Sequence, residues 1–473
     1  MSEKSGAIES HHIDYVPTDE RHGKVWRQGP FWFLGNFQPF TVAIGLLGPV
    51  FGLNLLWSAI AAITGILFGT LFMAAHAAQG PQLGLPQMIQ SRAQFGYVGV
   101  IFPLIATIFT FVAFNVVDVV IIKIGLKDIF KWNMTAVAVV ISLAAVLLAI
   151  YGHDWLHKVF QVLFWASLPF WVILTIGIMT GNAGGHAVDK GVFSYAGFFS
   201  MFAIAASYNI TYAPYVSDYT RYLPKDTRPS SIIKAVFIGA SGSPIWLMPL
   251  GSWLAIHFGA TDALKGIHDA GNNTVGNVGN ILAILSVLAL VATMGLNAYS
   301  GMLSVVTAVD SYRPIASGAK ARIYTIVGLG ILWLAFGIGI SSASAALNNS
   351  LIVMLYLLAP WTSVNLIDFY AVRHGKFAIT DFFKPNGIYG RWGAKGIISY
   401  LVGIAVEIPF MFIPGFYESV GAKWLKDVDI SWAIGLVVAG GLYYFLTRSL
   451  DLNAEKVAVE ASELALKNKE VLR

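Results

Sequence analysis

The chain has 473 residues, of which 56% are hydrophobic and 12% are charged, with a formal net charge of +5. A soluble domain carries roughly 25% charged residues, so this composition excludes a soluble or secreted enzyme and predicts a protein embedded in a lipid bilayer. The sequence contains no cysteine, which excludes a disulfide scaffold, a thiolate metal site and a cysteine nucleophile.

Twelve apolar stretches follow the polar first thirty residues, and each is long enough to cross about 30 Å of hydrocarbon as a helix. Continuous apolar runs differ from the alternating strands of a membrane barrel, so the sequence predicts an all-α integral membrane protein. The predicted spans are 31–55, 57–78, 99–124, 134–151, 157–181, 196–217, 232–257, 279–306, 322–341, 347–371, 396–414 and 431–447.

The Lys and Arg residues predict the orientation of these spans. An even number of spans places both termini on one side, and most of the 30 Lys and Arg residues lie in the termini and the even-numbered loops. Basic loops are retained on the cytoplasmic side of a membrane. We therefore expect a multi-pass protein of the cell membrane with both termini in the cytoplasm, and the positive charge requires no nucleic acid partner.

The first and sixth spans each combine polar residues with a proline. The segment Asn36-Phe37-Gln38-Pro39 interrupts the first span, and Ser207-Tyr208-Asn209 with Thr211 precedes Pro214 in the sixth. Proline removes a backbone donor and clashes with the preceding turn. Either each proline only kinks a packed helix, or both spans are broken around a shared central site. The coincidence of two such interruptions favours the second interpretation.

These interruptions stand at the first helix of two five-helix units, which predicts an inverted repeat. The expected segments are a cytoplasmic N-terminal tail (1–30), the first five-helix repeat (31–181), the second, inverted repeat (196–371), helices eleven and twelve (396–447) and a cytoplasmic C-terminal tail (448–473). In such an arrangement freed backbone carbonyls hold a cation, and half-helix ends face a polar substrate.

Local sequence adds a family resemblance. The segments SDYTRYLP, Ser217 to Pro224, and GPQLGLPQMIQSRAQFGYVG, Gly80 to Gly99, resemble signatures of the nucleobase:cation symporter family, which includes cytosine, purine, uracil, allantoin and hydantoin permeases. The segment NAYSGMLS, Asn297 to Ser304, resembles the family more weakly. The resemblance covers about residues 20 to 450. It implies twelve helices in a leucine-transporter-type fold, with a planar substrate between spans one, three, six and eight and transport by alternating access.

The resemblance also implies a set of substrate-binding residues. Gln38 matches the family's polar position in the broken first span, and Asn297 matches a substrate amide in span eight. Tyr208 and Asn209 match the positions where the family stacks an aromatic ring on the substrate and offers polar contacts. An amide complements the edge of a pyrimidine or purine, and an aromatic face suits its plane.

Span three departs from the family pattern, because Phe114 and Asp118 stand where members often carry a tryptophan and a glutamine. A carboxylate deep in hydrocarbon is costly unless it is paired or lines a wet cavity, so Asp118 is a functional candidate. It could accept from a ring N–H or an exocyclic amine, favour a cationic substrate, or carry a coupling proton. The competing interpretation is a structural hydrogen bond or an ion pair with Lys123.

Candidates for cation coupling are Asn36 at the first break, Asp118, and Thr293 in span eight. Sodium-coupled relatives use hydroxyls in span eight, and here Thr293 follows two apolar residues, which favours protons over sodium. Asp218 and Arg221 lie where span six meets the cytoplasm and are predicted to cap and gate that end. No catalytic group, no bound metal and no cofactor other than co-transported H⁺ or Na⁺ is expected.

The predicted function is the import of a nucleobase, cytosine or a purine, or a similar small heterocycle by cation symport. The alternatives are a symporter of the same fold for a vitamin precursor such as hydroxymethylpyrimidine or a pyridoxine-like ring, for allantoin or for a small organic cation. A membrane-embedded enzyme or a channel is disfavoured, because the spans show neither a catalytic constellation nor a continuous polar stripe. The expected partners are the substrate and the bilayer, with the protein a monomer or weak oligomer.

Overall fold

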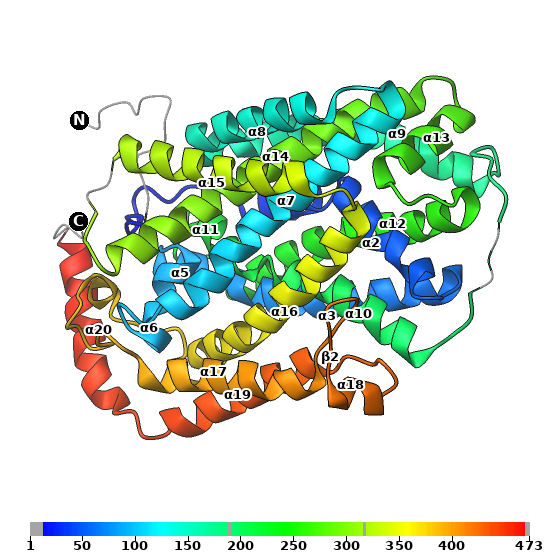
Figure 1. Ribbon diagram of the computed structural model, residues 1–473. Coiled ribbons are helices and arrows are strands. Elements are labelled where there is room, and N and C mark those ends of the chain that lie inside the picture. Colours follow the sequence, from blue (N-terminus) through cyan, green and yellow to red (C-terminus); the bar gives the residue numbers. More distant parts are fainter. Residues whose placement is uncertain (1–12, 188, 190, 316–317, 469–473) are drawn as a thin grey trace.

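A computed structural model of the chain shows a bundle of long helices and describes residues 13–187, 189, 191–315 and 318–468 (Figure 1). Each of the twelve predicted spans contains a long helix or a broken pair of helices, although the span expected at 396–414 ends as an α-helix at Glu407. In chain order they are α1 (Gln28–Gly35) with α2 (Pro39–Val50), α3 (Leu55–Ala77), α7 (Ile101–Phe130), α8 (Met134–Tyr151), α9 (His153–Met179), α10 (Tyr195–Ile210) with α11 (Ala213–Thr220), α12 (Pro229–Phe258), α14 (Val278–Asp310), α15 (Ala319–Gly339), α16 (Ala343–Ile367), α17 (Ala394–Glu407) and α19 (Ser431–Thr447). Among the described residues, eight single helices are long and apolar enough to cross a membrane unaided.

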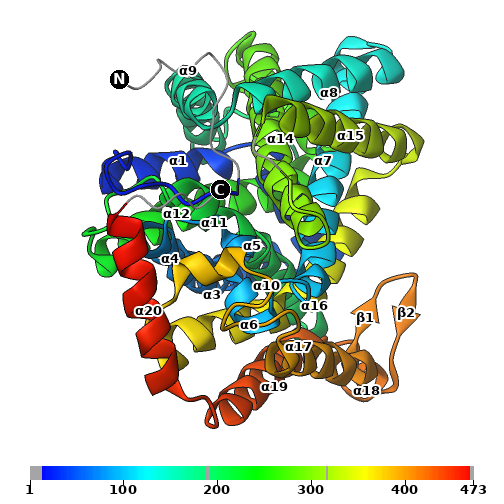
Figure 2. The same cartoon turned by 90° about the vertical axis from the view of Figure 1, so that its left-hand side faces the viewer.

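Short elements connect these helices. They are η1 (Val25–Arg27), α4 (Gln79–Leu83), α5 (Gln87–Gln90), α6 (Arg92–Phe95), α13 (Ala263–Thr274), η2 (Asp368–Val372), η3 (Ile379–Phe383), η4 (Ile408–Phe410), β1 (Phe412–Ile413), β2 (Tyr417–Glu418), α18 (Val420–Trp424) and α20 (Leu452–Lys467). The strands β1 and β2 pair antiparallel, with Phe412 opposite Glu418. Figure 2 shows α20, at the end of the chain, crossing one end of the bundle.

The first span is broken between Gly35 and Pro39, and the helical segments on either side are bent by 55°. Gln38 is extended and caps α2, because its side-chain oxygen accepts a hydrogen bond from the backbone N–H of Phe40 at 2.5 Å. Pro39 occupies the first position of α2, where a missing backbone N–H leaves no helical hydrogen bond unmade. The proline therefore starts a second helix and does not merely kink one.

The sixth span is interrupted by a two-residue turn, Thr211 and Tyr212, between α10 and α11. Pro214 lies in the first turn of α11, as Pro39 does in α2. The Thr211 hydroxyl donates to the carbonyls of Ser207 at 2.8 Å and Tyr208 at 3.0 Å. A hydroxyl of this kind satisfies carbonyls at the end of a helix, so the interruption is stable inside the protein.

Glycine contacts join the two repeats at equivalent places. A Cβ atom at Gly45 of α2 would lie 2.0 Å from the Met248 carbonyl oxygen of α12, and one at Gly69 of α3 would lie 2.1 Å from the Ala206 carbonyl oxygen of α10. Only glycine permits backbones to approach this closely. The first helix of each repeat thus packs directly on the second helix of the other.

Candidate functional site

Aromatic rings from α2, α7, α10 and α11 and from the turn at Tyr212 meet where the two broken spans face α7. Phe40 of α2 stacks on Tyr208 of α10, with ring centroids 5.4 Å apart and an interplanar angle of 11°. Phe114 of α7 lies 5.4 Å from Phe40 and 5.4 Å from Tyr212. Tyr215 of α11 continues this group, 4.8 Å from Tyr212. We call these five residues the aromatic cluster, and all five are buried.

Asp118 lies beside the aromatic cluster, one turn of α7 beyond Phe114. Its side chain is buried, and among the described residues its Oδ1 atom has no hydrogen-bond partner. The carboxylate interacts electrostatically with Tyr208, Tyr212 and Tyr215. A buried carboxyl oxygen without a hydrogen-bond partner can bind a proton or accept a hydrogen bond from a ligand.

Lys123 does not pair with Asp118. Its Nζ atom donates to the carbonyls of Gly337 at 2.7 Å and Ile338 at 2.8 Å, at the end of α15. The five-residue separation places the two side chains on different faces of α7. The ion pair considered as an alternative from the sequence is therefore not formed among the described residues.

Gln38 connects the first break to the aromatic cluster. Its Oε1 atom caps α2, and its Nε2 atom donates to the Tyr208 hydroxyl at 3.0 Å. The Thr41 hydroxyl also contacts the Tyr208 hydroxyl at 3.0 Å and donates to the Asn36 carbonyl at 2.6 Å. Gln38 thus holds Tyr208 in place while it fixes the break.

Asn36 and Asn209 bind to each other and to the neighbouring backbone. The Asn36 amide donates to Asn209 Oδ1 at 3.0 Å and to the Ala240 carbonyl at 2.8 Å. The Asn209 amide donates to the same carbonyl at 3.0 Å and to the Thr70 hydroxyl at 2.7 Å. These contacts tie both breaks to α3 and α12, so the two side chains fix the geometry of the site.

Asn297 of α14 faces α7. Its Nδ2 atom donates to Asn115 Oδ1 at 2.8 Å, and Asn115 in turn donates to the Met294 carbonyl at 3.1 Å. The Asn297 Oδ1 atom is buried and has no partner among the described residues. In contrast, the Thr293 hydroxyl donates to the Ala289 carbonyl of its own helix at 3.1 Å. Asn297 therefore offers an acceptor, whereas the Thr293 donor is already used within α14.

Asp218 and Arg221 lie at the end of α11, and both are buried. Asp218 accepts from the backbone N–H of Gln87 at 3.0 Å. Arg221 donates to the hydroxyls of Tyr222 at 2.9 Å and Tyr299 at 3.3 Å. The two charged side chains thus connect the broken sixth span to α5 and α14.

Several residues of this region were not found from the sequence, namely Phe40, Tyr212, Tyr215 and Asn115. A signal for the tyrosines was present, because Tyr208, Tyr212, Tyr215 and Tyr219 follow one another at spacings of four, three and four residues. Such spacings place side chains on one helical face. Phe40 and Asn115 carry no comparable pattern, since their roles depend on which helices become neighbours.

Comparison with known proteins decides the family. Residues 15–435 match the sequence profile of the permeases for cytosine/purines, uracil, thiamine and allantoin. The chain belongs to this family. It is 35% identical over 447 residues to the "Putative purine-cytosine permease YxlA" of Bacillus subtilis (strain 168), which covers 93% of this chain and 96% of the relative. A purine-cytosine permease of Emericella nidulans is 23% identical over 93% of this chain and 88% of its own length.

Solved structures show the fold. Mhp1, a nucleobase-cation-symport-1 family transporter in a closed conformation with bromovinylhydantoin bound, matches with a TM-score of 0.75 at 16% identity, over 96% of this chain and 100% of its own. A Na⁺-coupled sialic acid symporter matches with a TM-score of 0.60 at 12% identity, over 92% of this chain and 91% of its own. The twelve-helix, leucine-transporter-type fold implied by the family resemblance is confirmed. The protein is a multi-pass membrane transporter of the nucleobase:cation symporter family and not an enzyme.

Proposed function

We propose that this permease imports a nucleobase, cytosine or a purine, together with a proton. The observation that carries the proposal is the open Asp118 Oδ1 atom beside the aromatic cluster. A flat ring bound beside the aromatic cluster would present a ring N–H or an exocyclic amine to this oxygen. The open acceptor on Asn297 would receive a second donor of the same ring.

Protons are favoured over sodium because the group left open beside the aromatic cluster is a single carboxyl, that of Asp118. Sodium needs several oxygen ligands directed at one point, whereas a proton needs one carboxylate. Asp118 supplies that carboxylate, and a co-transported proton is the only cation the proposal requires.

The orientation is also proposed, with both termini in the cytoplasm. It is supported by the excess of Lys and Arg in the termini and even-numbered loops. With this orientation α1 and the end of α11 lie toward the cytoplasm, and Asp218 and Arg221 are gating residues at that end.

A second candidate substrate is a pyridoxine-like ring. The vitamin B6 transporter of Saccharomyces cerevisiae is 28% identical over 218 residues, which cover 44% of this chain and 38% of the relative. A pyridinium nitrogen would form an ion pair with the Asp118 carboxylate, which a neutral nucleobase does not.

A thermal-shift screen of the purified protein separates these candidates. Ligands that bind the native state raise its apparent melting temperature by mass action. We expect cytosine or a purine to stabilise the wild type at slightly acidic pH, without a requirement for sodium. Stabilisation by pyridoxine alone would make a pyridoxine-like ring the substrate and would overturn the nucleobase assignment. Stabilisation that requires sodium would overturn proton coupling.

A further inference from the structure

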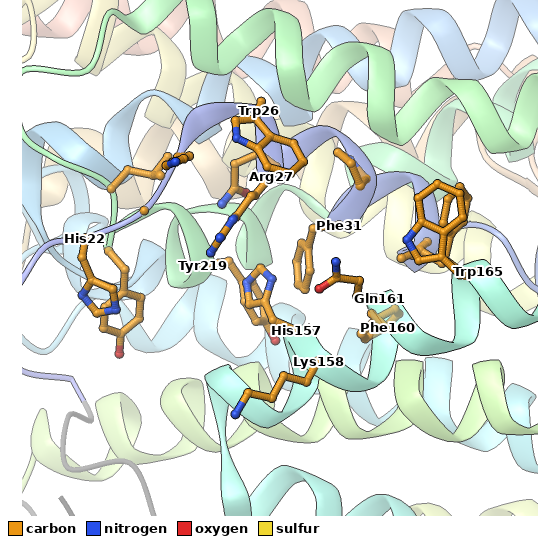
Figure 3. A pocket seen from close by; sticks show the side chains of 18 residues that line it. His22, Trp26, Arg27, Phe31, His157, Lys158, Phe160, Gln161, Trp165 and Tyr219 are labelled. Atoms are coloured by element: carbon orange, nitrogen blue, oxygen red, sulfur yellow. The ribbon is translucent and has the colours of Figure 1, made fainter. Parts of the chain in front are cut away.

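A cavity of about 480 Å³ lies apart from the aromatic cluster, between the first half of the broken first span and the start of α9. Its walls come from η1, α1, α9 and the end of α11 with the loop that follows (Figure 3). All of these are ends of spans that the distribution of Lys and Arg assigns to the cytoplasmic side. We call this cavity the α1–α9 crevice.

One wall of the crevice is aromatic and borders the surface that the bilayer covers. Phe31 stacks on the His157 ring with centroids 4.0 Å apart and lies 5.6 Å from Phe160. Further out on α9, Trp165 is 65% exposed. Only 28% of the apolar window of α9 is buried inside the protein, so most of this helix contacts lipid. The crevice therefore opens toward acyl chains.

Basic side chains line the crevice on both sides. Lys24, Arg27 and Lys158 line the crevice and are exposed, and none of them has an acidic partner among the side chains that the structure describes. Arg27 lies over the Trp26 ring at 5.9 Å, and Lys158 over the Trp155 ring at 5.5 Å. In Figure 3, Arg27 and Lys158 come from the two elements on either side of Phe31 and His157. Basic groups thus meet an apolar, lipid-facing groove at the level of the membrane surface.

We propose that the α1–α9 crevice binds an anionic phospholipid of the cytoplasmic leaflet. The phosphate lies between Arg27 and Lys158, and one acyl chain follows the aromatic wall past Phe164 and Trp165. Basic pockets between helices on the cytoplasmic side suit anionic headgroups, and tryptophan suits the interface. The proposal rests on the proposed orientation of the chain but not on the identity of its substrate.

The test is lipid titration of the detergent-purified protein, followed by native mass spectrometry. Phosphatidylglycerol should bind more tightly than phosphatidylcholine. Each basic residue contributes roughly fivefold in affinity near an anionic lipid, so the double variant R27Q/K158Q should bind phosphatidylglycerol about 25-fold more weakly. The matched control R313Q/K320Q removes two exposed basic residues from another loop of the same predicted side and should change binding by less than about twofold. Equal binding of the two lipids, or equal losses in both double variants, would overturn the proposal.

A second comparison separates a lipid from a free phosphate or a substrate. W165Q alters an exposed side chain of the aromatic wall, so the fold should be kept while phosphatidylglycerol binding weakens. Glycerol phosphate, the soluble headgroup, should not displace the lipid at equal concentration, and neither should cytosine. Displacement by glycerol phosphate would make the crevice a phosphate site, displacement by cytosine would make it part of the substrate path, and either result would contradict the lipid assignment.

Discussion

Within the membrane spans, two buried carboxyl groups, Asp118 and Glu407, have oxygens without hydrogen-bond partners among the described residues, but they lie in different surroundings. Asp118 stands among tyrosines where both broken spans meet α7. Glu407 lies at the end of α17 and packs against the backbone of Gly435 in α19. A Cβ atom added at Gly435 would lie 1.8 Å from the Glu407 Oε1 atom. Its acidic neighbour, Asp429, already accepts from Ser431 and Phe412.

This comparison shows that burial alone does not identify a functional acid. Both carboxyl groups bear the cost of leaving water. Only Asp118 lies beside stacked rings and helix breaks that can hold and release a flat ligand. Glu407 lies outside the two repeats, at the end of α17 and against Gly435 of α19, and we interpret it as a structural residue.

The largest expected effect is that of Asp118→Asn. The amide keeps the size of the side chain but cannot carry a proton, so we expect concentrative uptake of labelled cytosine into proteoliposomes to fall by about 100-fold or more. This corresponds to the roughly 3–5 kcal/mol lost when one partner of a buried charged contact is removed. Uptake near the wild-type level in this variant would contradict a role for Asp118 in either binding or coupling.

Tyr208→Phe tests the polar side of the aromatic cluster. The ring remains, but Gln38 and Thr41 lose the hydroxyl that both contact. A buried donor left without a partner costs about 1–3 kcal/mol, so substrate affinity should fall roughly tenfold. Equilibrium binding of labelled substrate measures this loss. The matched control is Tyr324→Phe, at a tyrosine of α15 that is 73% exposed, and it should leave affinity unchanged.

Asp262 extends the comparison to a buried acid outside the spans. It caps α13 by accepting from the backbone N–H of Lys265 at 2.6 Å, and burial raises its pKa from 3.8 to about 6. A raised pKa means that the folded state favours the protonated form. The contribution of Asp262 to stability is therefore greatest below about pH 4, falls as the pH rises to about 6 and stays level above it.

Asp262→Asn should remove this pH dependence, because asparagine also caps helices but does not ionise. Its melting temperature at neutral pH should rise, by the equivalent of at most about 3 kcal/mol. Thermal melts across the pH range measure the difference. The exposed Asp226→Asn should follow the wild-type curve, and a destabilised D262N at neutral pH would show that the charge itself is needed.

The smallest effect is expected for Glu407→Gln. Neither carboxyl oxygen has a partner to lose among the residues that the structure describes, so stability should change by no more than about 1 kcal/mol. Uptake should stay within about twofold of the wild type. A loss of uptake as large as that of Asp118→Asn would remove the distinction between the two acids.

Much of the fold could be predicted from the sequence, because a bilayer forces each long apolar run to satisfy its own backbone as a helix. Local sequence of this kind predicted the twelve spans and the breaks at Pro39 and Pro214. The family resemblance rested on local sequence as well. Helix ends were predicted less well. The span expected at 196–217, for example, ends at Thr220 and contains the two-residue turn at Thr211 and Tyr212.

The individual roles of the candidate site residues could not be predicted in the same way. Asn36 was expected to serve the cation and Asn209 the substrate, and both roles stay predictions. The structure shows their side-chain amides hydrogen-bonded to each other and to the Ala240 carbonyl. Phe40 was not expected at all. Which polar groups remain open depends on contacts between residues that are far apart in the chain.

The sequence by itself determined the environment, the number of helices and the places where two of them break, because these depend on hydropathy and on the backbone chemistry of proline. The tertiary structure decided that the two broken spans and α7 bring five aromatic rings together, with three of the tyrosines close enough to interact with Asp118, that Lys123 is held by α15, and that Glu407 faces a glycine. Hydrogen-bond partners are set by distances of a few ångströms between different helices, and such distances exist only once the helices have packed.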